Sequence, residues 1–340
     1  MAPKSIYLRA KGGLSYGWGH VIRTRTLAYA LSKCAWVQQL CVCVEADEGI
    51  REKLDLNEVQ HQFVEFGDLQ GEVAQLESMK PDVVIIDMLY IDDELIRLYR
   101  SHGCRIIAFN DMADQDYAVD MMIYPQVFDH VPQKKSHSHL AGAKYFILNP
   151  NFTASNITSH EKSKIQQKTY NLFVYSGGCI SKENFFALEQ LIMPLCDLNV
   201  EINFILGFDC EARSLASGSH AAKNLNYIEG SDRLYEYAAL ADLALVSSGY
   251  IKYELACAGV PALLFSIVEH QDELGAQFAK HARCAQYVGY LRDLQPNLVK
   301  QTVVSLLGDE KKRAEMSAYG KSYVDGQGAV RVCEAIAGID

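Results

Sequence analysis

The feature that most restricts the fold of this chain is a regular alternation of short β-rich runs with longer segments of helical period. Residues 5–10, 39–44, 83–87 and 105–110 have the pattern of strands, and residues 21–33 and 92–102 have the pattern of helices between them. Parallel strands need crossover connections of this length, which helices usually supply. The alternation therefore predicts an α/β domain built on a parallel sheet.

The alternation stops in the middle of the chain and then starts again. It fades between residues 117 and 168, where the polar residues 134–139 are predicted to form a loop. It returns with predicted strands at 171–175, 201–206, 243–246 and 262–265 and predicted helices at 182–195 and 276–281. We therefore predict two Rossmann-like parallel-sheet domains that face across a cleft. The first covers residues 1–155, the second covers residues 165–325, and residues 326–340 form a C-terminal helix.

Composition and charge argue against several classes of protein. A length of 340 residues, 49% of them hydrophobic, is enough for two ordinary domain cores. A formal net charge of -10 argues against a nucleic-acid-binding surface, which is usually basic. The ten cysteines form no CxxC pair and mostly lie in apolar runs, so we expect reduced core thiols and a cytoplasmic protein. No apolar run approaches the roughly 20 residues of a membrane span, and no signal-peptide core follows Met1.

A glycine-rich loop follows the first predicted strand. Gly12, Gly13, Gly17 and Gly19 lie in this loop, and His20 and a helical pattern come directly after it. A strand, a glycine loop and a helix form a common cradle for a phosphate or a substrate. His20 then lies at or next to the helix N-terminus, where the helix dipole disfavours an imidazolium, so a neutral ring can act as a general base. The alternative interpretation is a capping or core histidine beside an ordinary glycine turn.

Motifs in both halves of the chain match a known family in register. In the first half, the loop pattern RADxSxxIGxGHxxR is matched by Arg9, Ala10, Gly17, Gly19, His20 and Arg23. An apolar strand that ends in aspartate is matched by Ile85-Ile86-Asp87 with Tyr90, and an FDD turn is matched by Phe109-Asn110-Asp111. The family motif LxRPEF is matched by Leu148-Asn149-Pro150-Asn151-Phe152. The second half adds Ser176-Gly177-Gly178, and the segment from Ser247-Ser248-Gly249 to Ala262, followed by Glu269-His270-Gln271. On these motifs, most of the chain resembles the nucleotide-sugar hydrolases of pseudaminic acid biosynthesis and the related spore-coat polysaccharide biosynthesis proteins.

The resemblance implies a GT-B fold, as in the peptidoglycan-type N-acetylglucosaminyltransferases, with a C-terminal helix that crosses back to the first domain. It implies hydrolysis of a nucleotide-activated sugar, with UDP as the expected nucleotide, in the biosynthesis of a bacterial surface glycan or a nonulosonic-acid-like sugar. His20 matches the family's catalytic histidine. The matching substrate-binding positions are Lys11, Gly12, Gly13, Tyr16, Gly17, Gly19, Arg23, Asp87, Tyr90, Asp111 and Asn149. The matching nucleotide-binding positions are Ser176, Gly177, Gly178, Ser247, Ser248, Gly249, Tyr250, Glu254, Glu269, His270 and Gln271. No cofactor and no metal are expected, and the expected partner is the nucleotide sugar rather than a nucleic acid or a membrane.

Several positions depart from the family pattern. Lys11 stands where the family has aspartate, Gly13 where it has serine, and Asn149 where it has arginine. The aspartate of the family's GGSD loop is replaced within Cys179-Ile180-Ser181. A lysine in place of a carboxylate can pair with an acidic sugar or with phosphate, so the sugar can differ from the family's diacetamido trideoxyhexose.

Three functions remain open from the sequence. In hydrolysis, His20 deprotonates a water molecule that attacks C1 of the sugar with inversion. In glycosyl transfer, the same base deprotonates an acceptor hydroxyl group instead. The third function is a non-catalytic sensor of a nucleotide sugar. A metal site is less favoured because the polar-loop histidines lack the i,i+4 spacing of helical ligands. These histidines are His130, His137, His139 and His160.

Overall fold

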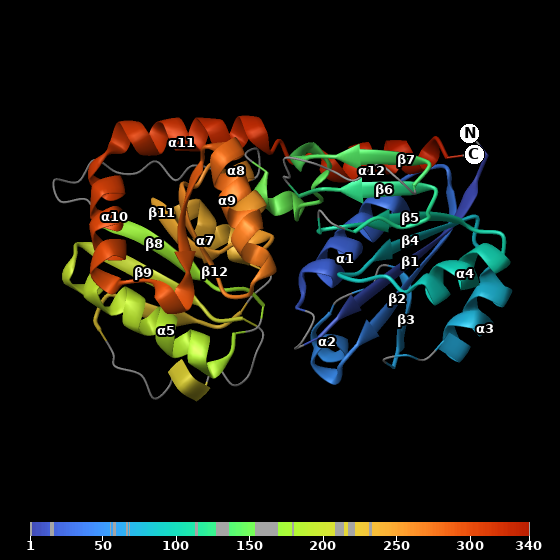
Figure 1. Ribbon diagram of the computed structural model, residues 1–340, viewed down its shortest axis with the longest axis horizontal. Coiled ribbons are helices and arrows are strands. Elements are labelled where there is room, and N and C mark those ends of the chain that lie inside the picture. Colours follow the sequence, from blue (N-terminus) through green and yellow to red (C-terminus); the bar gives the residue numbers. More distant parts are fainter. Residues whose placement is uncertain are drawn as a thin grey trace. The chain divides into compact units, whose positions relative to one another are not determined.

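The chain folds into two compact α/β units. The computed structural model describes residues 2–13, 17–54, 56, 59–65, 67, 69–112, 115–126, 136–153, 169–178, 180–207, 214–216, 222–230 and 233–339. Unit 1 contains Met1–Leu148 and Gly326–Asp340, and unit 2 contains Asn149–Asp325. Each unit has its own parallel sheet (Figure 1).

Unit 1 is built on a sheet whose strand order is β3-β2-β1-β4-β5-β6-β7. Every neighbouring pair in this sheet is parallel. The strands are β1 (Lys4–Gly12), β2 (Val37–Ala46), β3 (Gln60–Val64), β4 (Val83–Asp87), β5 (Arg105–Phe109), β6 (Met121–Tyr124) and β7 (Ser138–Ala141). The helices are α1 (Gly19–Ser32), α2 (Glu48–Lys53), α3 (Leu69–Met79), α4 (Asp93–Ser101) and α12 (Gly328–Ala337), with a 3₁₀ turn η1 (Ala143–Tyr145).

The central strands of unit 1 place the carboxyl ends of the sheet in a row. β4 is an apolar run that is buried along its whole length, as expected for a central strand of a parallel sheet. Its register pairs Ala10 with Asp87 and Asp87 with Phe109, so β1, β4 and β5 end at the same edge. The strand order reverses between β1 and β4, and ligands of such sheets bind at this switch point.

The helix α12 follows unit 2 in the sequence but packs within unit 1. It contacts α1 and η1, and Val332, Cys333 and Ile336 on it are buried. At its first residue, a Cβ on Gly328 would lie 2.1 Å from the carbonyl oxygen of Phe146, so the two backbones touch. This close approach accepts only glycine without a shift of the helix.

Unit 2 repeats the same organisation with the strand order β10-β9-β8-β11-β12-β13. The strands are β8 (Tyr170–Tyr175), β9 (Val200–Ile205), β10 (Leu225–Ile228), β11 (Leu243–Ser247), β12 (Ala262–Ser266) and β13 (Ala285–Tyr290). The helices are α5 (Lys182–Ile192), α7 (Leu234–Leu240), α8 (Ile251–Ala258), α9 (His270–Ala282), α10 (Pro296–Gly308) and α11 (Glu310–Tyr323). The 3₁₀ turns are η2 (Pro150–Phe152), η3 (Met193–Asp197) and η4 (Leu291–Asp293). The order reverses between β8 and β11, which places the switch point of unit 2 beside two glycine-containing loops.

The predicted α/β fold class is confirmed, and the strands predicted in both halves are present. The predicted loop at residues 134–139 is wrong in part, because Ser138 and His139 begin strand β7. β7 is the last strand in the order of this sheet and pairs with β6, so its polar residues remain compatible with a strand at an edge. Residues 134 and 135 of the predicted loop belong to the segment 127–135, which lies outside the described ranges. The eight described cysteines are free thiols, and six of them are buried. None of the helices in the described ranges combines the length and hydropathy that a bilayer crossing requires.

Candidate active site

The glycine loop of unit 1 closes on itself between β1 and α1. Gly17 donates its N–H to the Gly13 carbonyl at 2.7 Å, and Gly13 donates to the Gly17 carbonyl at 3.2 Å. Gly17 has φ +75°, in the left-handed region that favours glycine. α1 begins at Gly19, which makes His20 its second residue, and the His20 side chain is buried. The predicted Tyr16 lies outside the described residues.

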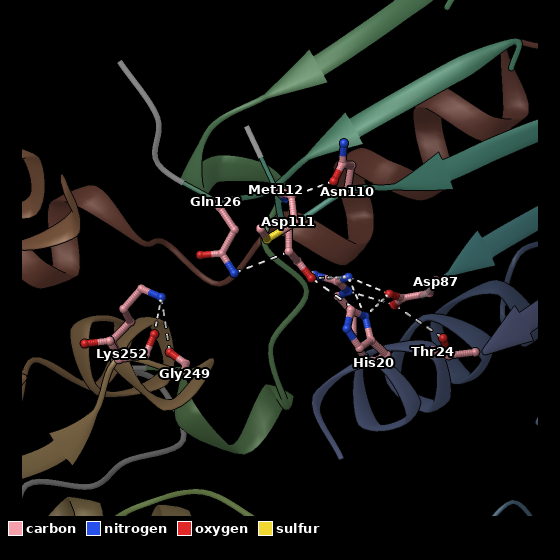
Figure 2. A network of polar contacts seen from close by, with 11 residues as sticks. His20, Thr24, Asp87, Asn110, Asp111, Met112, Gln126, Gly249 and Lys252 are labelled. Atoms are coloured by element: carbon pink, nitrogen blue, oxygen red, sulfur yellow. Dashed lines mark hydrogen bonds and ion pairs between the residues drawn. The ribbon is translucent and has the colours of Figure 1, made fainter. Parts of the chain in front are cut away.

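Asp87 orients the imidazole ring of His20. The ring Nδ1 lies 2.8 Å from Oδ1 of Asp87, the last residue of β4 (Figure 2). A carboxylate can only accept, so the ring must donate Nδ1–H in this contact. A neutral imidazole with a proton on Nδ1 carries its lone pair on Nε2. The contact therefore prepares Nε2 of His20 to accept a proton.

Arg23 joins Asp87 to Asp111. One turn after His20, its Nε donates to Oδ2 of Asp87 at 2.7 Å, and its two terminal nitrogens donate to the two oxygens of Asp111 at 3.0 Å each. The guanidinium also lies over the Phe109 ring, with Cζ 4.7 Å from the ring centroid. Burial acts to raise the pKa of Asp87, but Arg23 and then His20 lower it, and the net pKa is below the usual value. Asp87 is therefore ionised at neutral pH.

Gln126 extends this row of polar groups along the sheet edge. Its amide nitrogen donates to Oδ1 of Asp111 at 3.3 Å. Asp87, Asp111 and Gln126 come at or just after the carboxyl ends of β4, β5 and β6, which are neighbours in the sheet. Sequence reasoning missed Gln126 because it follows a four-residue strand in the region where the α/β pattern fades.

Within the described residues, one group of three side chains has the spacing of metal ligands. His20, Asp87 and Asp111 each offer one ligand atom, and these atoms lie within 4.8 Å of one another. The Arg23 guanidinium already donates to both carboxylates, so a metal ion would have to compete with a cation that belongs to the chain. The arrangement therefore fits the orientation of a histidine better than the coordination of a metal.

Lys11 lies in a second, charge-balanced network behind the loop. Its Nζ is 2.9 Å from Oε1 of Glu45, and the buried Arg9 donates to Glu45 at 2.6 Å and to Glu72 at 3.0 Å. Tyr99 also donates its hydroxyl to Glu72. Burial acts to raise the pKa of Glu45, but Lys11 and Arg9 bring it below the usual value. The structure thus places Lys11 on a carboxylate of its own domain, where it fixes the ends of β1 and β2.

In unit 2, two loops meet at the switch point of the sheet. β8 pairs Tyr175 with Val246 of β11, so the residues that follow, Ser176 and Ser247, lie at the same edge. Ser176 is buried, and its hydroxyl has no hydrogen-bond partner among the described residues. A buried hydroxyl without a partner is costly, which makes Ser176 a candidate donor to a ligand.

The second of these loops leads into α8 with its N–H groups available. Ser248 donates its N–H and its hydroxyl to the carbonyl of Phe265, at 2.8 and 3.0 Å, which fixes the loop against β12. Across the described residues, no hydrogen bond is found for the N–H groups of Gly249 and Ile251. Free N–H donors at a helix start attract anions.

Glu254 lies in the first turn of α8. No hydrogen bond or ion pair of its carboxylate occurs within the described part of the chain. Part of the side chain is exposed, yet the surrounding protein desolvates the carboxylate, and this burial raises its pKa to about 7. In its ionised form, the Glu254 carboxylate can accept hydrogen bonds from two hydroxyl groups of a ligand.

The remaining predicted positions differ in their surroundings. Glu269 and His270 are exposed at the start of α9, whereas Gln271 accepts a hydrogen bond from the N–H of Ile267 at 3.2 Å. Asn149 uses its side-chain oxygen to cap η2 at the start of unit 2. Tyr90, just beyond β4, is 64% exposed. The structure thus brings two sets of predicted residues together, one at the switch point of each sheet.

Comparisons with known proteins agree with this architecture. No protein-family model matches the chain. It is homologous to the spore coat polysaccharide biosynthesis protein SpsG of Bacillus subtilis, with 26% identity over 336 residues that cover 95% of each chain. Among solved structures, MurG of Acinetobacter baumannii aligns with a TM-score of 0.69 and 14% identity over 99% of this chain and 100% of that one. A UDP-GlcNAc 2-epimerase from Neisseria meningitidis bound to UDP-GlcNAc aligns with a TM-score of 0.69 and 12% identity over 98% and 100%. The chain has a GT-B fold of two Rossmann-like parallel-sheet domains.

Proposed function

We propose that this protein acts on the anomeric carbon of a nucleotide-activated sugar and that it hydrolyses the bond to the nucleotide. The observation that carries the proposal is the 2.8 Å contact from Nδ1 of His20 to Asp87 at the switch point of unit 1. It is supported by the homology to a polysaccharide biosynthesis protein and by the fold shared with an epimerase that holds UDP-GlcNAc.

His20 is the general base of the proposed reaction. Its Nε2 takes a proton from water while the water oxygen forms a bond to C1 of the sugar. The bond from C1 to the phosphate oxygen breaks, its electron pair leaves with the nucleoside diphosphate, and the configuration at C1 inverts. The imidazolium that results is stabilised by Asp87, and Oδ2 of Asp111 lies 3.7 Å from the same Nδ1.

Unit 2 binds the nucleoside diphosphate in this proposal. The N–H groups of Gly249 and Ile251 and the hydroxyl of Ser176 are donors for the phosphate oxygens. Glu254 accepts the ribose hydroxyls. UDP is the first nucleotide to test, because the epimerase with the same fold holds a UDP-sugar.

Glycosyl transfer is the second candidate. The structural likeness to MurG favours it. The chemistry also allows it, because the same base can deprotonate an acceptor hydroxyl as well as water. The two reactions differ in whether nucleotide release needs an acceptor.

The test is turnover of a panel of UDP-, CDP-, GDP- and dTDP-sugars by the purified protein. Hydrolysis predicts equal amounts of free sugar and nucleoside diphosphate without any acceptor, and loss of both products in His20→Ala. His102→Ala is the matched control, since His102 caps α4 and its Nδ1 contacts the Leu98 carbonyl. Nucleotide release that appears only with an added acceptor would contradict hydrolysis and support glycosyl transfer. If no member of the panel binds or is turned over, both functions are rejected.

A further inference from the structure

Lys252 is a buried lysine at the start of α8, next to the loop that holds Gly249. The side chain is 1% exposed although it lies in the first turn of the helix. Its ammonium donates to the Ser248 carbonyl at 2.8 Å and to the Gly249 carbonyl at 3.3 Å. Figure 2 shows the side chain turned back onto this loop. The ammonium also lies over the rings of Tyr253 and Phe278, 4.8 and 5.8 Å from their centroids.

Two general effects disfavour a cation at this position in the free protein. The N-terminal turn of a helix carries partial positive charge, which repels the Lys252 ammonium. Burial adds a desolvation cost, which the contacts with carbonyl groups and aromatic faces reduce. Lys252 is a cation that is both buried and placed at a helix N-terminus. An anionic ligand beside it would lower the energy of such a cation.

The hydrogen bonds of Lys252 also set the direction of the loop N–H groups. In a trans peptide unit, the carbonyl and the N–H of the next residue point in opposite directions. Because Nζ holds the carbonyl of Ser248, the N–H of Gly249 points away from the lysine. The ammonium thus turns a donor outward and adds a full positive charge behind it.

We propose that Lys252 positions the loop at Ser248 and Gly249 and supplies charge for binding the diphosphate group of the nucleotide. This inference rests on the proposed function, because it names how the nucleotide site of unit 2 recognises phosphate. Sequence reasoning did not select Lys252, although a lysine inside the apolar stretch from Ile251 to Cys257 is an available signal.

The test compares the binding of UDP with that of uridine, which lacks phosphate, by calorimetry. Lys252→Met keeps an apolar stem against Tyr253 and removes the charge. We expect UDP to bind at least about tenfold more weakly and uridine to stay within about twofold, because only UDP carries the anion. Lys300→Met is the matched control, since that ammonium pairs with the exposed Asp197 at 3.1 Å, and it should leave both affinities unchanged.

Each outcome decides between distinct conclusions. Unchanged UDP binding by Lys252→Met, or equal losses for UDP and uridine in a folded variant, would overturn the role of Lys252 and leave the proposed function standing. Failure of the wild-type protein to bind any nucleoside diphosphate would reject both the role of Lys252 and the proposed function. If Lys252→Met does not fold, Lys252→Gln keeps hydrogen-bond donors without the charge. The ratio of UDP to uridine affinity must then fall for the inference to hold, and an unchanged ratio rejects it.

Discussion

At the scale of single residues, Arg23 explains how two carboxylates can lie beside one histidine. Asp87 and Asp111 are both buried, and the guanidinium donates to each of them. The three groups carry a formal net charge of −1, which an imidazolium on His20 neutralises. In the proposed reaction, the cluster meets the positive charge that His20 gains when it takes a proton from water.

Asp87→Asn tests whether this carboxylate fixes the protonation of His20. If the amide oxygen keeps its contact with Arg23, the amide nitrogen faces Nδ1 and donates to it, which moves the ring proton to Nε2. We expect kcat to fall about 10²- to 10⁴-fold, the range of general-base catalysis, with KM changed little. Steady-state kinetics on a turned-over nucleotide sugar measure this, with circular dichroism to show a folded variant. An unchanged kcat would exclude the orienting role.

Glu254 gives a prediction for pH. With a pKa of about 7, its carboxylate is about one tenth ionised at pH 6 and about nine tenths ionised at pH 8. If the ionised form binds the ribose hydroxyls, the apparent Kd for uridine should fall about tenfold across this range. Uridine is the right probe because it carries no phosphate that titrates in the same interval. Calorimetry at pH 6, 7 and 8 measures the change.

Glu254→Gln is the control for this pH dependence. Glutamine does not titrate, so its uridine affinity should be independent of pH, and an equal slope in both proteins would contradict the assignment. Stability must change in the opposite sense. The raised pKa means that the folded state holds a proton that the unfolded state has lost, so the free wild-type protein becomes less stable as pH rises from about 4.5 to about 7. The glutamine variant lacks this contribution.

At the scale of elements, the sequence predicts best where strand, loop and helix follow each other closely. The predicted strand at 5–10 and the helix at 21–33 correspond to β1 and α1, because an apolar run, a glycine loop and a helical period each specify the same local structure. β6 and β7 were missed because strands of four residues carry too little pattern. The contact of Lys11 with Glu45 was also missed, since register between strands, not spacing along the chain, places them together.

The position of α8 depends on a close contact with α11. A Cβ on Gly320 would lie 2.7 Å from the Ala256 carbonyl oxygen and 3.1 Å from the Cβ of Cys284. Gly320→Ala should lower the local stability of unit 2 by about 1–3 kcal/mol, because the crowded atoms include backbone. Gly308→Ala, at a helix position with nothing within 4 Å, should be neutral or stabilising by up to about 1 kcal/mol. Hydrogen exchange of α8 and α11 in unit 2 compares the two variants, and equal effects would mean that the α8–α11 contact adapts.

At the scale of the whole molecule, the chain builds the same switch-point architecture twice. In each unit the first strand of the sheet lies beside the fourth in chain order, β1 beside β4 and β8 beside β11. Each unit therefore places its polar loops at the carboxyl edge of its sheet, with a histidine in unit 1 and a helix start in unit 2. A substitution can therefore lower the stability of one unit while the stability of the other unit is measured separately.

The C-terminal helix offers such a perturbation. Ile336 on α12 is fully buried in unit 1, so Ile336→Ala should cost about 2–5 kcal/mol of the local stability of that unit. A two-domain chain has no single free energy of unfolding, so the measurement is hydrogen exchange of separate segments. Protection should fall in α1 and β1, while β8 and β9 of unit 2 keep theirs. Val330→Ala is the control, because Val330 lies on the same helix but is 52% exposed and should change protection little. If β8 and β9 lose protection as much as β1 does, the two units unfold as one cooperative structure, and the separate stability of unit 2 is rejected.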